Sequence, residues 1–118
     1  MFKNYQKIYK VLLWNRFKVC NNIFFMANPI KKVCCIGAGY VGGPSMTVMA
    51  DRSPEIEFNV VDKNLKRIES WNSLDLNNLP IYEPGLMKLI KKCRNKNLYF
   101  SNEIEKNIEL ADMIFISV

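Results

Sequence analysis

The sequence predicts an α/β fold, with a doubly wound, mainly parallel sheet of about four strands and helices on both faces. Two observations predict it. From residue 31 onward, short apolar runs alternate with segments of helical spacing, and a glycine-rich turn joins the first run to the first helical segment. Strands that alternate with helices imply right-handed crossovers, which place successive strands parallel in one sheet.

The predicted elements follow one another in a regular order. Strands are predicted at residues 33–37, 58–62, 97–100 and 113–118, where short apolar runs occur. Helices are predicted at residues 44–51, 64–71, 86–93 and 103–110, where apolar residues recur at helical spacing. Residues 73–84 contain two prolines and several turn-forming residues, so we expect a loop there.

A GxGxxG motif lies between the first predicted strand and the first predicted helix. Its residues are Gly37, Ala38, Gly39, Tyr40, Val41 and Gly42. The spacing alone is weak, but in this context the glycines permit a tight turn, close approach to a pyrophosphate and close helix packing. The N-terminus of the helix would offer free N–H groups and partial positive charge to the phosphates. The alternative is a strand-to-helix turn that binds nothing, which the surrounding pattern disfavours.

An acidic residue stands where a dinucleotide site needs one. Asp62 ends the second predicted strand, 20 residues after Gly42. A carboxylate there can accept both ribose hydroxyls of an adenosine and would repel the 2′-phosphate of NADP, so NAD is the expected cofactor. Arg67 could fold back toward the adenosine or phosphates, although by spacing alone a surface arginine is the simpler interpretation. Lys63 could soften the preference for NAD or lie in solvent.

These features divide the 118 residues into two regions. We interpret residues 29–118 as an incomplete NAD-binding Rossmann domain and residues 1–28 as a basic N-terminal extension outside the fold. Residues 1–25 carry five of the 17 Lys and Arg and none of the 11 Asp and Glu, so the net charge of +6 comes mostly from this stretch. The remainder is nearly neutral, and no nucleic-acid partner is expected.

The extension has two open interpretations. It lacks the uninterrupted apolar stretch of a secretory signal and the Arg- and Ser-rich composition of a transit peptide. A leader with no role in the fold is favoured, because Met26 opens a compact segment and would serve as an ordinary start. The alternative is a helix that binds a membrane surface or a partner.

The cysteines predict neither a metal site nor disulfides. Cys20, Cys34, Cys35 and Cys93 show no CxxC spacing, and the sequence has no histidine. Cys34 and Cys35 would point to opposite faces of a strand and are read as small core residues. We therefore expect reduced cysteines and a cytoplasmic location, and we assign no metal ligand.

Four segments together resemble the amino-terminal part of the UDP-glucose 6-dehydrogenases, within the UDP-glucose/GDP-mannose dehydrogenase family. They are residues 33–44 (VCCIGAGYVGGP), 54–62 (PEIEFNVVD), 79–86 (LPIYEPGL) and 111–118 (ADMIFISV). The resemblance covers about residues 30–118. It is specific, because LPIYEPGL is typical of nucleotide-sugar dehydrogenases and is not a general Rossmann feature.

The resemblance implies an activity and a set of site residues. The family oxidises UDP-glucose to UDP-glucuronate with two molecules of NAD, and the full-length enzymes are expected to be homo-oligomers. By resemblance, residues 37–42 would hold the pyrophosphate, Asp62 and Arg67 would contact the adenosine ribose, and residues 79–86 would shape the surface near the cofactor. The family's catalytic cysteine would lie beyond residue 118, so no catalytic residue is assigned, and UDP-glucose would bind only with further domains.

Two other functions stay open. One is a catalytically inactive, truncated module that still binds NAD. The other is the corresponding part of a sister enzyme that acts on GDP-mannose or UDP-N-acetylmannosamine. The residues themselves do not identify the sugar.

Overall fold

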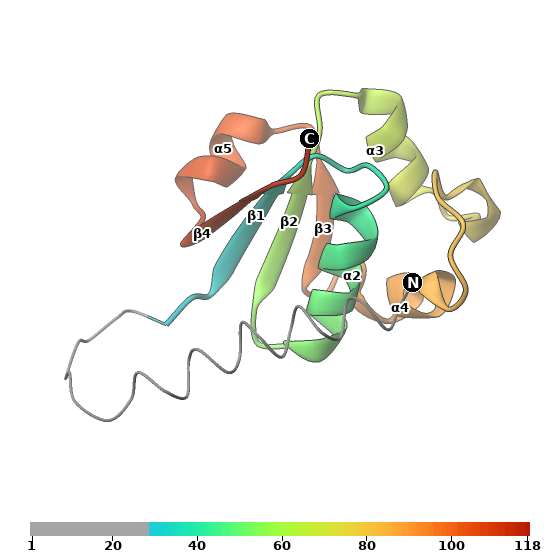
Figure 1. Cartoon of the computed structure of the whole chain (residues 1–118), viewed down its shortest axis with the longest axis horizontal. Coiled ribbons are helices and arrows are strands. Elements are labelled where there is room, and N and C mark those ends of the chain that lie inside the picture. The colour runs from blue at the N-terminus through green and yellow to red at the C-terminus, as the bar shows by residue number, and fades with distance from the viewer. Residues whose placement is uncertain (1–28) are drawn as a thin grey trace.

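A computed structural model describes residues 29–118, and the predicted basic extension at residues 1–28 lies outside the described residues. Four strands form one parallel sheet in the order β3-β2-β1-β4 (Figure 1). The strands are β1 (Lys32–Ile36), β2 (Glu57–Val61), β3 (Leu98–Ser101) and β4 (Met113–Ile116). The predicted parallel α/β sheet is confirmed.

The strand order reverses at β1. From β1 the chain adds β2 and then β3 on one side, and it returns through α5 (Ile104–Glu109) to place β4 on the other side. In the register, Cys35 pairs with Val60 of β2 and with Phe115 of β4. The carboxyl ends of β1 and β4 therefore flank a topological switch point, which is where open α/β sheets bind their ligands.

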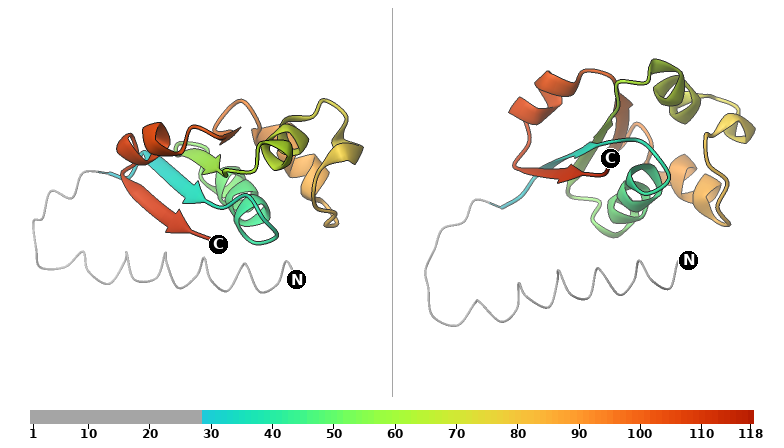
Figure 2. Two further views of the ribbon diagram at one scale, coloured as in Figure 1. Left: turned by 90° about the horizontal axis from the view of Figure 1, so that it is seen from above. Right: turned by 45° about the horizontal axis from the view of Figure 1, so that its top comes forward.

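Helices cover both faces of the sheet, as predicted. Helix α2 (Gly42–Arg52) packs with α4 (Leu86–Cys93) on one face, and α5 lies on the opposite face (Figure 2). Helix α3 (Leu65–Asn72) lies near β3. None of the helices that the structure describes is long and apolar enough to cross a membrane.

The core lies between the sheet and the α2–α4 layer. Its largest fully buried side chains include Trp71, Phe58, Leu86, Ile90 and Leu98. Each contributes about 1.5–3 kcal/mol relative to an exposed position. Cys34 and Cys35 on β1 are also fully buried, in agreement with their predicted place in the core.

The observed elements differ from the predicted ones mainly at their ends. Helix α2 begins at Gly42 and not at Pro44, because the Gly43 N–H already donates to the carbonyl of Gly39 (3.2 Å). Strand β4 ends at Ile116, two residues before its predicted end.

The predicted loop also contains a short helix that the sequence pattern did not indicate. A 3-10 helix occupies Leu76–Asn78, because the Asp75 side chain accepts the N–H of Asn77 (3.0 Å) and caps the turn.

Candidate cofactor site

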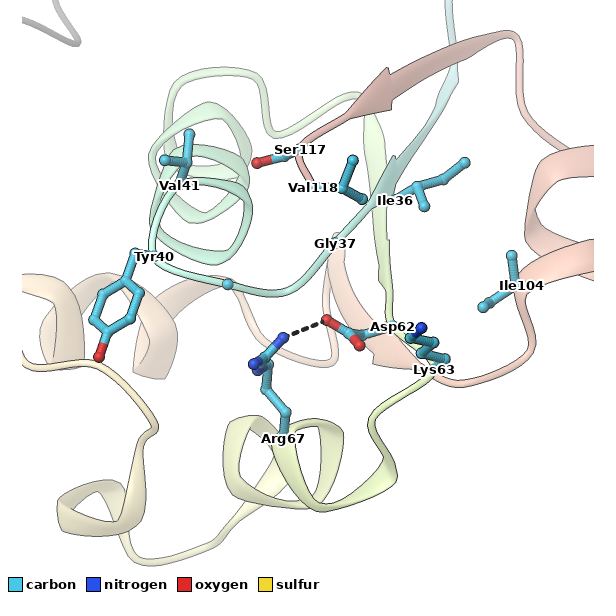
Figure 3. Close-up of a pocket in the computed structure, with 11 residues that line it drawn as sticks. Ile36, Gly37, Tyr40, Val41, Asp62, Lys63, Arg67, Ile104, Ser117 and Val118 are labelled. Carbon is cyan, nitrogen blue, oxygen red and sulfur yellow. Dashed lines mark hydrogen bonds and ion pairs between the residues drawn. The ribbon is translucent and has the colours of Figure 1, made fainter.

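A pocket opens at the carboxyl ends of β1, β2 and β4, at the topological switch point (Figure 3). Its volume is about 570 Å³, within the range of small-molecule sites. The lining residues are Ile36, Gly37, Gly39, Tyr40, Val41, Asp62, Lys63, Arg67, Ile104, Ser117 and Val118. The pocket thus gathers most of the predicted site residues with groups from β4 and α5.

Gly37 makes the tight turn that leaves β1. Its φ of 109° lies in the region that favours glycine, and a Cβ there would overlap the carbonyl oxygen of Ser117. Its N–H donates to the carbonyl of Val61 (2.7 Å), while Ser117 N–H donates to Ile36 (2.8 Å). The turn is therefore held between the ends of β2 and β4, and no side chain fits there.

Gly39 faces open space. A Cβ built at this position meets no heavy atom within 4 Å, and its φ is not in the glycine-favouring region, so the protein's own packing does not require glycine here. The N–H groups of Gly39, Tyr40 and Val41 donate to no backbone or side-chain acceptor within residues 29–118. These amides stand at the N-terminus of α2, where the helix dipole favours an anion.

Gly42 brings α2 against the end of β1. A Cβ at Gly42 would overlap the carbonyl oxygen of Gly37 and lie 3.2 Å from the Cys35 sulfur. The close helix–strand packing expected of the third glycine is present. Gly42 itself is buried and does not line the pocket.

Asp62 is the buried carboxylate of the site. One oxygen accepts the Ala38 N–H (2.9 Å) and the Arg67 guanidinium (3.0 Å), and the other accepts the Asn64 N–H (2.8 Å). Burial alone would raise the pKa of Asp62, but the two backbone donors and Arg67 outweigh it and hold the pKa below its usual range. The site therefore keeps a negative charge at neutral pH.

The pairing of Asp62 with Arg67 limits how the carboxylate can bind a ribose. A carboxylate has about four acceptor positions, and protein donors take three of them at Asp62. Figure 3 shows Arg67 reaching up from α3 to Asp62. The Arg67 side chain is 41% exposed, so it can move. To accept both ribose hydroxyls, Asp62 would have to release Arg67.

Residues 31–118 match the model of the UDP-glucose/GDP-mannose dehydrogenase family, NAD binding domain. The chain belongs to this family. It is 61% identical over 87 residues to UDP-glucose 6-dehydrogenase from Drosophila melanogaster and 56% identical over 87 residues to UDP-glucose 6-dehydrogenase 4 from Arabidopsis thaliana. Each match covers 74% of this chain, and the chain spans only 18% of either relative's length.

A solved structure shares the fold. The UDP-glucose dehydrogenase from the hyperthermophilic archaeon Pyrobaculum islandicum superposes with a TM-score of 0.63 at 22% sequence identity. The superposition covers 82% of this chain and 22% of that one. The family resemblance found in the sequence is thus confirmed, and an NAD-binding domain is the part of the family that the chain matches.

Within this family domain, the predicted site residues fall into two groups. Gly37, Gly39, Asp62 and Arg67 line the pocket, as do Tyr40 and Val41, whose side chains are exposed. Ala38 lies beneath the loop: it is fully buried, its N–H donates to Asp62 and its carbonyl accepts the Trp71 indole N–H (2.9 Å). Ala38 therefore shapes the loop and offers no backbone group to a ligand.

Several residues that line or support the pocket are not indicated by the sequence pattern. Ser117 and Val118 enter the lining because β4 ends beside β1, and the switch-point rule could have identified them. Ile104 enters from α5, and no local pattern indicates that placement. Trp71 and Gly43 lie against the loop from below, a contact that only the tertiary structure reveals.

The segment 79–86 does not reach the pocket. Ile81 and Leu86 are buried in the core, Tyr82 is exposed, and no residue of the segment is in the lining. In the described residues this segment contributes Ile81 and Leu86 to the core, and the place near the cofactor that the resemblance implies stays a prediction.

The described cysteines and acidic residues form no metal site. No group of three or more His, Cys, Asp or Glu in residues 29–118 could hold a metal ion.

Burial, with a smaller effect of Cys34, raises the pKa of Cys35 to about 11, and burial also raises the pKa of Cys34 and Cys93. These thiols stay protonated at neutral pH and are poor nucleophiles.

Proposed function

We propose that the pocket binds NAD, with the pyrophosphate on the loop of residues 37–42 and the adenosine ribose at Asp62. The observation that carries this proposal is the open face at Gly39. The fold does not require a glycine there, yet an added Cβ would fill the space that a phosphate needs, and that space is bordered by N–H groups that have no acceptor within residues 29–118. Backbone amides at a helix N-terminus are a common phosphate site.

The charge of Asp62 supports NAD over NADP. The carboxylate is buried, keeps its negative charge and lines the pocket. A ribose hydroxyl can donate to it, whereas a 2′-phosphate would be repelled. Release of Arg67 toward solvent would leave room for the second hydroxyl of the ribose.

We further propose that the chain provides the NAD-binding part of an enzyme that oxidises UDP-glucose to UDP-glucuronate. NAD is the hydride acceptor in such a reaction, and the pocket residues would bind and orient it. The names of the curated relatives support UDP-glucose, with GDP-mannose and UDP-N-acetylmannosamine as the alternative sugars. We propose that this enzyme is cytoplasmic and homo-oligomeric. In it, residues 29–118 would form the cofactor-binding domain.

A chimera tests this function. Residues 31–118 replace the matching segment of the Drosophila melanogaster enzyme, to which the chain is 61% identical. We expect the chimera to form NADH, measured at 340 nm, when UDP-glucose and NAD are supplied, and to prefer NAD to NADP. GDP-mannose and UDP-N-acetylmannosamine are tested in parallel.

A matched control separates binding from folding. The same chimera with Gly39→Val should fold, because space is open at this position, and should lose most of its activity. A folded chimera that is inactive with every sugar, or one whose activity ignores Gly39→Val, would contradict the proposed function.

A further inference from the structure

Trp71 is a fully buried aromatic residue in the last turn of α3. Its ring stacks on Phe100 of β3, with ring centroids 4.7 Å apart and planes 1° from parallel. Its backbone carbonyl accepts a hydrogen bond from the Arg94 guanidinium (2.8 Å), which also donates to Ser73. Phe100 therefore holds the ring of Trp71 and Arg94 holds its backbone, and neither residue lines the pocket.

The indole also holds the glycine loop from below. Trp71 Nε1 donates to the carbonyl of Ala38 at 2.9 Å, and the N–H of Ala38 donates to Asp62 at 2.9 Å. Both backbone polar groups of Ala38 are thus fixed. Helix α2 also packs tightly against the indole, since a Cβ at Gly43 would overlap the indole ring. This contact gives a steric reason for the glycine that follows the GxGxxG motif.

We propose that Trp71 is a positioning residue that sets the direction of the Gly39 N–H. In a trans peptide the carbonyl and the N–H point to opposite sides, and no peptide in the described residues is cis. Because the Ala38 carbonyl points down to the indole, the N–H of Gly39 in the same peptide points away from the core. Gly39 lines the pocket and its N–H has no protein acceptor within residues 29–118.

The opposite orientation of this peptide would oppose anion binding. Turned over, it would present the Ala38 carbonyl oxygen to the pocket and bury the Gly39 N–H. A carbonyl dipole repels a phosphate, so only the orientation held by Trp71 is competent to bind one. The apparent Kd rises in proportion as the competent fraction falls. This inference rests on the proposed NAD site for its ligand, but the loop geometry stands without it.

Trp71→Phe tests the proposal in the 118-residue chain. Phenylalanine keeps an aromatic ring against Phe100 but lacks the indole N–H donor and the second ring, so the Ala38 carbonyl loses its partner and a space opens beside Gly43. We expect the backbone amide signal of Gly39 in a ¹H–¹⁵N spectrum of the ligand-free chain to shift or broaden. We also expect the Kd for NAD of the folded protein to rise roughly tenfold.

Asn97→Ala is the matched control. The Asn97 side chain donates to carbonyls of Ala50, Ser53 and Ile56, near the C-terminal end of α2. That end is about 16 Å from the loop, given 1.5 Å per residue over the 11 residues of α2. This variant removes partly buried hydrogen bonds without touching the loop, so the Gly39 amide and the Kd should stay as in the unaltered chain.

The outcomes separate the two proposals. If the unaltered chain binds NAD and Trp71→Phe binds it equally well, or if Asn97→Ala weakens binding as much, the positioning role is wrong. If the unaltered chain does not bind NAD, the proposed function fails, and the Gly39 amide of the ligand-free chains still decides the loop geometry.

If the Trp71→Phe chain does not fold, a second measurement on a chain that keeps Trp71 tests the proposal. Trp14→Phe leaves Trp71 as the only tryptophan. In this chain, bound NAD should slow the exchange of the Trp71 indole N–H with water. An exchange rate that NAD leaves unchanged would overturn the positioning role.

Discussion

At the scale of single residues, the site depends on which glycines the fold needs and which it does not. Gly37 is needed by the fold, because its φ is 109° and a Cβ would overlap Ser117. Gly39 is not, because a Cβ there meets nothing within 4 Å. The motif predicts different roles for the two positions, and the structure shows that the fold itself requires glycine at Gly37 and not at Gly39.

This difference makes a prediction about Gly39→Ala. The free energy of unfolding, measured in urea, should stay within about 0.5 kcal/mol of the unaltered chain, or rise slightly through a less flexible unfolded state. The Kd for NAD should rise about tenfold or more, because the methyl group occupies the phosphate space. Gly37→Ala is the contrast, and it should lose several kcal/mol of stability or fail to fold. A destabilised Gly39→Ala chain that binds NAD normally would reverse this assignment.

Asp62 makes a prediction about pH. Its pKa is lower in the folded protein than the ordinary value of roughly 4, so its contribution to stability is fully present above that value. The contribution is lost as the pH falls below about 4 and through the folded pKa. In Asp62→Asn, the free energy of unfolding should be lower near pH 6 and should decline less steeply between about pH 5 and pH 3.

A second carboxylate, Asp112, provides the reference for comparing how the free energy of unfolding changes with pH in the two proteins. Asp112 also has a lowered pKa, because it accepts the N–H groups of Lys31 and Lys32, and it is present in both the unaltered chain and Asp62→Asn. The part of the slope that disappears in Asp62→Asn therefore belongs to Asp62. Equal slopes in the two proteins would show that the Asp62 carboxylate gains no net stabilisation from its three donors.

At the scale of elements, α3 connects the Asp62 side of the pocket to the core. Its N-cap Asn64 accepts the N–H of Arg67 through its side chain (3.1 Å), and its last turn carries Trp71. The first turn thus positions Arg67 beside Asp62, and the last turn supports the glycine loop.

The cap gives a prediction for α3. Asn64→Ala removes the side-chain acceptor and should lower the free energy of unfolding by about 1 kcal/mol, measured by thermal or urea denaturation. Asn64→Ser keeps a capping oxygen and should retain most of the stability. If alanine and serine destabilise the chain equally, the cap is not the source of the effect.

The sequence predicts most of the elements because their signals are local. The runs of β1 and β2 are mostly apolar, with Val33 to Ile36 in β1 and Phe58, Val60 and Val61 in β2. Helix α4 was predicted at its observed residues because Leu86, Leu89 and Ile90 recur at helical spacing. The end of β4 and the 3-10 helix at Leu76–Asn78 were missed, because pairing and a single Asp cap decide them.

For the site, too, residues with a local sequence signal were predicted and residues placed by tertiary packing were not. Gly37, Gly39 and Asp62, which line the pocket, were predicted because a GxGxxG motif after a strand and an acid at fixed spacing are local signals. Ile104 and Trp71 were missed as site residues, because they reach the loop or pocket only through the packing of α5 and α3.

At the scale of the whole molecule, β1 is the central element. It pairs with β2 on one side and β4 on the other, and its two cysteines are fully buried. Their exposure to solvent would require the sheet to open. The described cysteines therefore report on global unfolding.

This placement predicts very slow thiol labelling. In Cys20→Ser, the remaining thiols are Cys34, Cys35 and Cys93, all buried and with raised pKa values. A disulfide reagent at pH 8 should react with them at least about a thousandfold more slowly than in 6 M guanidinium, since labelling follows the unfolded fraction. Immediate labelling of Cys34 or Cys35 in the native chain would show that β1 is not held between two strands.

The central claim is that the loop of residues 37–42 and Asp62 form an NAD site, and calorimetric titration of the 118-residue chain with NAD and with NADP tests it most directly. We predict saturable binding of NAD at one site per chain and binding of NADP at least about tenfold weaker, a factor that corresponds to 1.4 kcal/mol. A folded chain that binds neither dinucleotide, or that binds both with equal Kd, would contradict the account.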